Sequence, residues 1–163
     1  MTDFLAAIEA SAFSTWLRES NSIWAYPTVL TLHTIGLGLL VGANAALDLR
    51  LLGFGAKLPL EGLHPLFKTM WIGFWINAAS GVLLLAADAT TKAAAPMFLI
   101  KLGLIAVGVV IIVFQRRVVY ASGTGPARIT PAARSLAVLS LSVWFVAIAA
   151  GRLMAYPGLF FGL

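Results

Sequence analysis

Residues 23–47 read IWAYPTVLTLHTIGLGLLVGANAAL and carry no acidic or basic side chain other than a histidine. A helix needs about 20 consecutive apolar residues to cross the hydrocarbon core of a bilayer, so this run is long enough to span a membrane. His33 lies near the middle of the run and is one of only 2 histidines in the chain. An ionisable side chain at that depth is costly in lipid and usually faces a helix bundle or a cofactor, which makes His33 the leading candidate for a functional residue.

The composition of the whole chain indicates a membrane protein. Of its 163 residues, 61% are hydrophobic and only 10% are charged, and the mean hydropathy is +0.97. Soluble domains carry about 25% charged residues. The net charge of +5 does not indicate nucleic-acid binding, because the basic residues lie at the ends of apolar runs. The absence of cysteine excludes disulfides, iron–sulfur clusters and thiolate-ligated haem.

Four apolar runs predict four transmembrane helices, at about residues 23–47, 69–87, 96–115 and 135–153. Helices satisfy their own backbone hydrogen bonds, which lipid cannot do for them. In residues 1–20, apolar side chains recur at helical spacing among charged ones, which predicts an amphipathic helix in the membrane interface. The predicted fold is therefore an all-α membrane protein: an interfacial helix over residues 1–20, then an antiparallel bundle of four transmembrane helices within residues 21–163.

Lysine and arginine counts predict the orientation of the chain. Seven of these residues lie around the connections after the first and third runs, and four lie on the other side. Cytoplasmic connections are enriched in lysine and arginine, so we expect both longer connections in the cytoplasm and both termini outside, in the periplasm of a Gram-negative bacterium. The seven are Arg50, Lys57, Lys68, Arg116, Arg117, Arg128 and Arg134, and the four are Arg18, Lys92, Lys101 and Arg152.

A helical projection of the first run places His33 on a stripe marked by polar side chains. Asn44 lies on this stripe and Asp48 near its edge, whereas Gly38 and Gly42 fall on the opposite side at a spacing suited to close helix packing. Three roles for His33 stay open: a structural histidine bonded to a neighbouring helix, a cofactor or metal ligand, and a proton relay. The stripe comprises Tyr26, Leu30, His33, Leu37, Leu40 and Asn44.

Small residues are expected at the depth of His33 on the other three runs. They leave room for a flat cofactor, although tight helix packing is the commoner use of small residues in membranes. Asn77 shares one face of the second run with Gly73 and Gly81. The small residues at this depth are Ser80, Gly81, Gly103 and Ala147.

Two cations are expected above His33 toward the outer surface. Lys101 and Arg152 are suited to hold haem propionates, a quinone head group or a lipid phosphate. Alternatively, Lys101 pairs with Asp88 and Arg152 only reaches toward the interface. The candidate cofactor-binding residues are His33, Lys101, Arg152, Tyr26, Asn77 and Gly81, and His33 is also the candidate metal ligand.

The second histidine does not complete a haem site with His33. His64 precedes the second run at its inner end, at a depth roughly 15–20 Å from His33, which is too far for two axial ligands on one iron. A haem on His33 therefore needs a methionine, another subunit or an open position opposite it. Together with His33, Met97 and Met154 also suggest a Cu(I) site, although scattered methionines usually fill cores.

Four stretches resemble a bacterial family of four-helix inner-membrane proteins of unknown function: WAYPTVLTLHTIGLGLLVG at 24–42, DLRLLG at 48–53, FWINAASG at 74–81 and FLIKLG at 98–103. This resemblance covers most of the chain and implies a multi-pass protein of the bacterial inner membrane. More distantly, the Leu-His-x-x-Gly of the first run, followed by Arg50, is similar to the copper-resistance D and HemJ-type protoporphyrinogen oxidase membrane families. Those families imply haem or copper handling with His33 as a ligand.

Three functions follow from these patterns. The first is a subunit of a membrane redox system that binds b-type haem or a quinone through His33. The second is a non-catalytic scaffold or accessory subunit, in a homo-oligomer or a larger membrane complex. The third is a small copper-handling protein or transporter, although polar residues are sparse at the midplane where transport sites lie. No paired carboxylates or histidine–acid clusters indicate independent catalytic activity.

Overall fold

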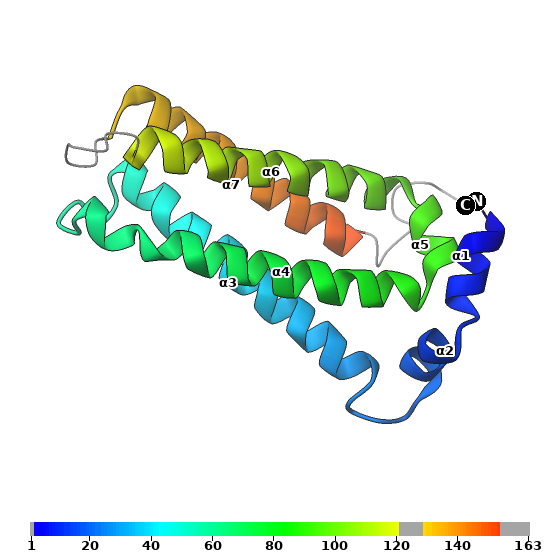
Figure 1. Cartoon of the computed structure of the whole chain (residues 1–163). Helices are drawn as coiled ribbons and strands as arrows, with labels where there is room; N and C mark the ends of the chain where they lie inside the picture. The colour runs from blue at the N-terminus through cyan, green and yellow to red at the C-terminus, as the bar shows by residue number, and fades with distance from the viewer. Residues whose placement is uncertain (1, 121–128, 154–163) are drawn as a thin grey trace.

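The computed structural model describes residues 2–120 and 129–153, and within these ranges every regular element is a helix. Four segments are long and apolar enough to cross a membrane: α3 (Tyr26–Leu52), α4 (Pro65–Ala86) with the short 3-10 helix η1 (Leu60–Leu63) before it, α6 (Pro96–Tyr120) and α7 (Pro131–Leu153). Figure 1 shows successive long helices running in opposite directions. The predicted all-α fold with four membrane-spanning helices is confirmed.

Each long helix extends beyond the apolar run that predicts it, always at the same end of the molecule. Helix α3 continues to Leu52 and α6 to Tyr120, while α4 starts at Pro65 and α7 at Pro131. Hydropathy places these ends at about 47, 115, 69 and 135. The difference arises because hydropathy detects where lipid contact stops, whereas backbone hydrogen bonding continues into the charged turns beyond it.

Local sequence explains where two of these helices end and begin. Gly53 ends α3 with a φ of 109°, and its N–H donates to the Arg50 carbonyl at 3.1 Å. Glycine adopts this left-handed conformation without the steric cost of a Cβ. Helix α7 begins after Thr130, whose hydroxyl accepts a hydrogen bond from the Ala133 N–H at 3.1 Å, and Pro131 occupies the first helical position.

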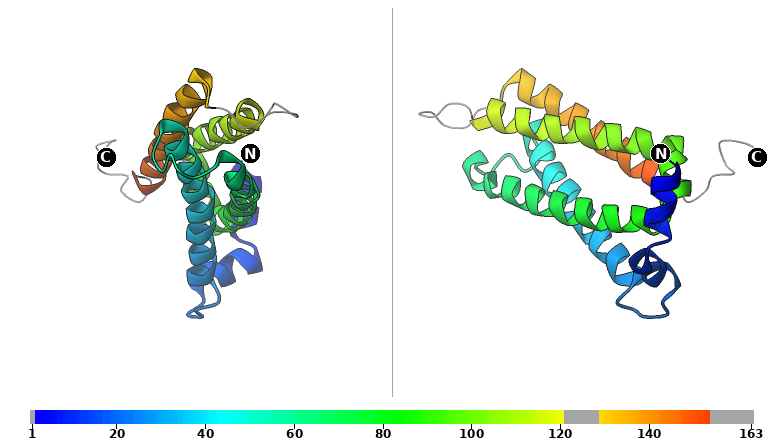
Figure 2. Two further views of the ribbon diagram at one scale, coloured as in Figure 1. Left: turned by 90° about the vertical axis from the view of Figure 1, so that its left-hand side faces the viewer. Right: turned by 45° about the vertical axis from the view of Figure 1, so that its right-hand side comes forward.

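The four long helices form two antiparallel pairs. Helix α3 packs along α4, α6 packs along α7, and α3 also contacts α7. The backbones of α4 and α6 lie further apart, as the ribbon views show (Figures 1 and 2), and these helices meet through side chains such as Phe67 and Tyr120, whose ring centroids are 5.7 Å apart. The helix backbones therefore approach one another most closely within the two pairs.

Two glycines bring the backbones of α3 and α4 together. A Cβ on Gly73 would lie 2.7 Å from the Gly36 carbonyl oxygen, and a Cβ on Gly36 would lie 2.6 Å from the Asn77 backbone nitrogen. Gly38 and Gly42, whose spacing also suits close packing, take no part in this contact: no atom of the chain lies within 4 Å of a Cβ built at either position. Helix α3 is rotated so that a different glycine faces its neighbour.

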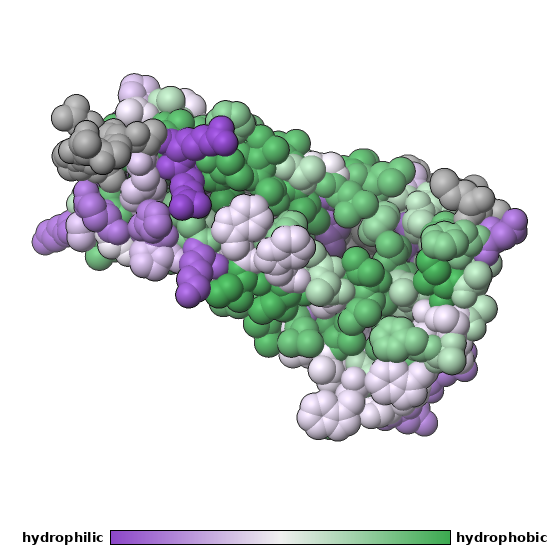
Figure 3. Space-filling view, viewed as in Figure 1, coloured by the Kyte–Doolittle hydropathy of each residue, from purple (hydrophilic) through white to green (hydrophobic). Residues whose placement is uncertain are grey.

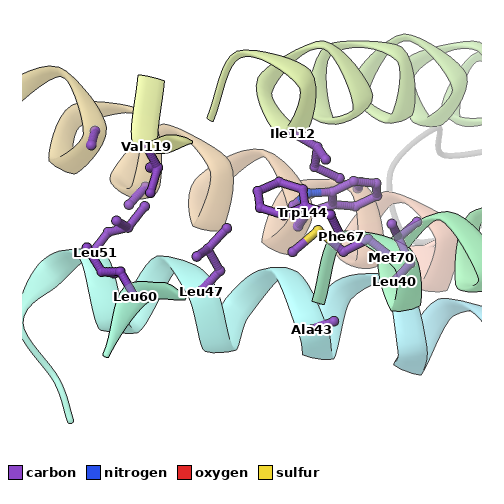
Figure 4. Close-up of a cluster of buried hydrophobic side chains, with 13 residues drawn as sticks. Leu40, Ala43, Leu47, Leu51, Leu60, Phe67, Met70, Ile112, Val119 and Trp144 are labelled. Atoms are coloured by element: carbon purple, nitrogen blue, oxygen red, sulfur yellow. The ribbon is translucent and has the colours of Figure 1, made fainter. Parts of the chain in front are cut away.

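The main hydrophobic core lies where α3, α4, α6 and α7 meet (Figure 4). Trp144 on α7 is only 2% exposed, and its indole packs against Gly108 on α6, where a Cβ would lie 2.7 Å from the ring. Outside this core the flanks of the helices stay apolar, and strongly hydrophilic side chains gather toward the ends of the molecule (Figure 3). This distribution matches a surface in contact with lipid. The buried side chains around Trp144 include Leu40, Leu47, Phe67, Met70 and Ile112.

The N-terminal segment forms two short helices where the sequence predicts one over residues 1–20. Helices α1 (Thr2–Glu9) and α2 (Ala12–Glu19) are separated at Ser11, whose hydroxyl accepts a hydrogen bond from the Ser14 N–H at 3.2 Å. A serine in this position satisfies a free N–H group at the start of a helix and favours a new helix there. Trp16 remains 46% exposed on α2, as expected of a helix in the membrane interface.

A short helix that hydropathy does not predict, α5 (Ala89–Ala94), lies between α4 and α6 and anchors the N-terminal helices. The Glu9 carboxylate accepts hydrogen bonds from the Thr90 hydroxyl at 2.7 Å and the Thr90 N–H at 2.9 Å. Arg18 donates to the Ala87 carbonyl at 3.0 Å. These contacts hold α1 and α2 across the end of the bundle at which α4 finishes and α6 begins (Figure 1).

Candidate functional site

His33 lies half-buried on α3 and faces α4. Its Nδ1 is 3.0 Å from the Asn77 carbonyl oxygen and 3.1 Å from the Ser80 hydroxyl. The Asn77 side-chain amide donates in return to the His33 carbonyl oxygen at 2.8 Å. The imidazole ring also packs against Gly81, where a Cβ would lie 3.1 Å from Cε1. The structure thus brings His33, Asn77 and Gly81 together, as the sequence predicts.

The neighbours of the imidazole determine which ring nitrogen carries the proton. The Asn77 carbonyl can only accept, and the Ser80 hydroxyl already donates to the Ile76 carbonyl at 2.6 Å. Both groups beside Nδ1 are therefore acceptors, so the neutral ring of His33 carries its proton on Nδ1 and keeps a lone pair on Nε2. Within the part of the chain that the structure describes, Nε2 has no hydrogen-bond partner. Metal-binding histidines are oriented in this way, with the second ring nitrogen donating to a carbonyl.

Lys101 on α6 is the cation whose charge acts on His33. Its side chain is half-buried and lies against α7, where a Cβ on Gly151 would be 3.5 Å from Nζ. The alternative pairing of Lys101 with Asp88 does not occur, because Asp88 pairs with Lys92 at 3.7 Å. The His33 imidazole and the Lys101 ammonium therefore occupy one region of the bundle, contributed by different helix pairs.

The structure does not bring the other two predicted cofactor-binding residues to His33. Tyr26 is 38% exposed in the first turn of α3, about 10 Å along the helix from His33. Arg152 is exposed near the end of α7 and forms no ion pair with any residue in 2–120 or 129–153. Both residues mark the rim of this end of the bundle.

The remaining candidate metal ligands do not gather around His33. His64 precedes α4 and lies about 20 Å along the helix from Asn77, in agreement with the separation expected from the sequence. Met97 lies in the first turn of α6, and Met154 lies outside the described residues. The described ranges contain no group of three or more His, Asp or Glu side chains that could hold a metal ion.

A second polar cluster surrounds Asp48 on α3. None of its residues is among the candidate site residues predicted from the sequence. Asp48 is fully buried, and its carboxylate accepts hydrogen bonds from the Asn44 amide at 2.6 Å and the Gln115 amide at 2.5 Å. The Asn44 amide also donates to the Ser140 hydroxyl at 2.6 Å. The cluster therefore ties α3 to α6 and to α7 through polar groups in the interior of the bundle, and no ion pair neutralises Asp48 within the described residues.

The sequence carries part of the signal for this cluster. Asn44 and Asp48 are one helical turn apart near one stripe of the first run, and this spacing indicates that their side chains can meet. Gln115 lies at the predicted end of the third run, and Ser140 is one of several serines in the fourth. Their convergence on Asp48 depends on how α6 and α7 are rotated, which only the folded structure reveals.

No protein-family model, curated protein or solved structure matches the chain.

Proposed function

We propose that this integral membrane protein is the cofactor-binding subunit of a membrane redox system, with b-type haem or a quinone bound at His33. The observation that carries the proposal is the orientation of the imidazole: Nδ1 is engaged by Asn77 and Ser80, and the Nε2 lone pair is left without a partner. A polar group this deep in a membrane protein calls for a partner. The resemblance of the first run to haem-handling and copper-handling families points the same way.

The residues around His33 fit either cofactor. A haem would be held by Nε2, with the Asn77 carbonyl fixing the ring, and the charge of Lys101 would suit its acidic propionates. A quinone would be held by a hydrogen bond to Nε2 from its reduced hydroxyl, with the Lys101 ammonium near the head group. In both cases the cofactor supplies the electron chemistry, and the protein supplies burial, orientation and charge. We place copper second, because no further ligand in the described residues gathers around His33.

We further propose that the protein lies in the bacterial inner membrane with both termini outside. The excess of lysine and arginine at the end of the bundle that carries the connections after α3 and α6 supports this orientation. The N-terminal helices then lie on the periplasmic face, close to the end of the bundle from which His33 is reached. Such a subunit would work in a larger complex or a homo-oligomer, since electrons must arrive from and leave to a partner.

A visible absorption spectrum of the full chain, purified in mild detergent, tests the proposal. We expect a Soret band that shifts on reduction with dithionite, or, if haem is absent, a quinone in the organic extract. His33→Ala should abolish either signal, and His64→Ala is the matched control that should retain it. The proposal is overturned if the wild-type protein carries neither cofactor, or if the bound cofactor survives His33→Ala.

A further inference from the structure

A cavity of about 460 Å³ opens between α4 and α6, at the end of the bundle opposite the N-terminal helices. Arg116 and Arg117 on α6 line one side, and His64, Phe67 and Trp71 line the other. The volume lies within the range of small-molecule and lipid-binding pockets, which is about 300–1,000 Å³. This cavity, which we call the end groove, lies between two helices whose backbones are not in close contact.

The wall of the end groove is held in place by aromatic contacts. The Tyr120 ring meets the His64 ring edge to face at a centroid distance of 5.2 Å and the Phe67 ring at 5.7 Å. The Tyr120 hydroxyl donates to the Leu60 carbonyl at 2.7 Å. These contacts fix the side chains before any ligand arrives, which lowers the entropic cost of binding.

The polar end of the groove is positively charged. Arg116 and Arg117 are exposed and form no ion pair with any residue that the structure describes. One carboxylate, Glu61, lies near enough to act on Tyr120, so the two guanidinium groups leave a net positive charge. Strongly hydrophilic side chains gather at this end of α4 and α6, and the apolar surface begins directly beside them (Figure 3).

The wall of the groove continues onto apolar surface. Trp71 lines the charged cavity, and beyond it Trp71 and Phe74 on α4 are both partly exposed beside a hollow of about 10 Å³, which is large enough only for a water molecule. A ligand lying along this path meets guanidinium groups at one end and hydrocarbon side chains at the other. Among molecules of the membrane, an anionic phospholipid presents this combination, with a phosphate at the interface and an acyl chain in the hydrocarbon core.

We propose that the end groove binds one anionic phospholipid, whose phosphate is held by Arg116 and Arg117 and whose acyl chain runs along Trp71 toward Phe74. Arginine suits this role, because its planar guanidinium donates two parallel hydrogen bonds to a phosphate. A soluble phosphate compound would leave the apolar surface of Trp71 and Phe74 beyond the arginines uncovered, and a quinone would leave the arginines without an anion. The lipid site is separate from His33, so it stands or falls independently of the redox cofactor.

Native mass spectrometry of the full chain, released from detergent or from nanodiscs of phosphatidylcholine with phosphatidylglycerol, tests the proposal. We expect one retained phosphatidylglycerol per chain, and retention reduced roughly tenfold in the Arg116→Gln/Arg117→Gln double variant. Arg134→Gln is the matched control, since Arg134 is an exposed arginine at the same end of the bundle that does not line the groove. It should bind like the wild type.

A second variant tests the groove itself while keeping both arginines. Val113→Trp fills the cavity, and we expect it to displace the lipid to a similar extent. Thermal unfolding of each variant shows whether it is folded when the lipid is measured. Equal retention of phosphatidylcholine, equal loss in Arg134→Gln, or full retention in both groove variants would each overturn the proposal, as would a quinone in place of the lipid.

Discussion

At Gly73 the backbones of α4 and α3 come so close that no side chain fits between them. A Cβ there would lie 2.5 Å from the Leu40 backbone nitrogen and 2.7 Å from the Gly36 carbonyl oxygen. Both are backbone atoms, so neither can rotate away, and the helices would have to separate. We expect Gly73→Ala to lower the free energy of unfolding by about 1–3 kcal/mol or more, measured by dodecyl sulfate titration in mixed micelles.

Gly38→Ala is the matched control for this substitution. Gly38 lies on the same α3 helix, two residues after Gly36, and a Cβ there meets no atom within 4 Å. Its free energy of unfolding should stay within about 0.5 kcal/mol of the wild type. An equal loss in both variants would show that any methyl group added to these helices is harmful, and the close approach at Gly73 would then have no special role.

Asp48 is an acidic residue that is fully buried in the core of the bundle. Replacing it with leucine leaves the Gln115 amide without its acceptor and the Asn44 amide with Ser140 alone, and an unsatisfied buried group costs about 1–3 kcal/mol. We expect Asp48→Leu to lower the free energy of unfolding by about 3 kcal/mol, and Asp48→Asn to lower it less, because the asparagine keeps one carbonyl oxygen. The same micelle titration measures both.

The double variant Asp48→Leu/Gln115→Leu distinguishes hydrogen bonding from packing in this cluster. Removing the Gln115 amide along with its acceptor should recover part of the stability lost in Asp48→Leu. An Asp48→Leu protein as stable as the wild type would mean that the amides find other partners, and the cluster would not tie the helices together.

At the level of single residues, the sequence predicts which residues belong to the candidate site better than it predicts which atoms they contact. His33 stands out because an ionisable group in an apolar run is rare. Its neighbours Ser80 and Gly81 follow from depth, and Asn77 from the helix face that it shares with Gly81. The tautomer of His33 could not be predicted, since it depends on the Ser80 hydroxyl donating elsewhere. Tyr26 shares the stripe of His33 but lies too far along the helix to reach it, because a projection down the axis hides axial distance.

Among the elements, α1 and α5 are held together by one carboxylate at the end of the bundle. The Thr90 hydroxyl, and after it the Thr90 N–H, hold the pKa of Glu9 below its usual value of 4.5 by donating hydrogen bonds to the charged form. A lowered pKa in the folded state means that the contact stabilises the fold above the usual value and weakens as the pH falls through the lowered one. Docking of α1 should therefore be intact at neutral pH and loosen in acid.

Spin labels at Ala7→Cys and Thr91→Cys measure this docking, because the chain has no cysteine of its own. We expect a narrow distance distribution at pH 7 that broadens as the pH falls below 4.5. With Glu9→Gln the distribution should not change with pH, since glutamine does not titrate. A contact that loosens as the pH rises would contradict the sign of the effect.

Hydropathy finds the long helices of this chain and misses the short ones. The four spans exceed the length that lipid requires, so their existence follows from composition. Helix α5 is only 6 residues long and carries alanines and threonines with no apolar face, so no periodicity marks it. The division between α1 and α2 had a local signal in Ser11, a residue type that favours helix starts.

At the scale of the whole molecule, the two ends of the bundle should face different compartments. Lys57→Cys lies in the connection after α3, and Thr91→Cys lies on α5 at the opposite end. On intact cells, we expect a membrane-impermeant maleimide to label Thr91→Cys and not Lys57→Cys, and the reverse in inside-out vesicles. The opposite pattern would show that the chain is inserted with its termini in the cytoplasm.

The pairing of helices is the part of the fold that the sequence predicts least. Helices α3 and α4, and helices α6 and α7, follow each other in the sequence, so we expect each pair to be neighbours, and both pairs are found. The same rule would also pair α4 with α6, which the shortest connection joins. The contact between α3 and α7, and the wider separation of the α4 and α6 backbones, could not be predicted, because helices that are apolar on every side give no preferred inward face. The glycines show the same limit: Gly36 and Gly38 are both small, and only the rotation of α3 decides which one packs.

The pairwise arrangement has a consequence for how the chain is made. Helices α3 and α4 leave the ribosome before α6 and α7, and their glycine contact needs nothing that follows them in the sequence. The first pair can therefore assemble in the membrane while α6 and α7 are still being synthesised. The Asp48 carboxylate is the exception: on the nascent first pair it has only Asn44, and it must wait for Gln115 of the second pair to arrive. The hydrogen bond from Gln115 to this buried acid therefore forms only after α6 is made, and it joins the two halves of the bundle.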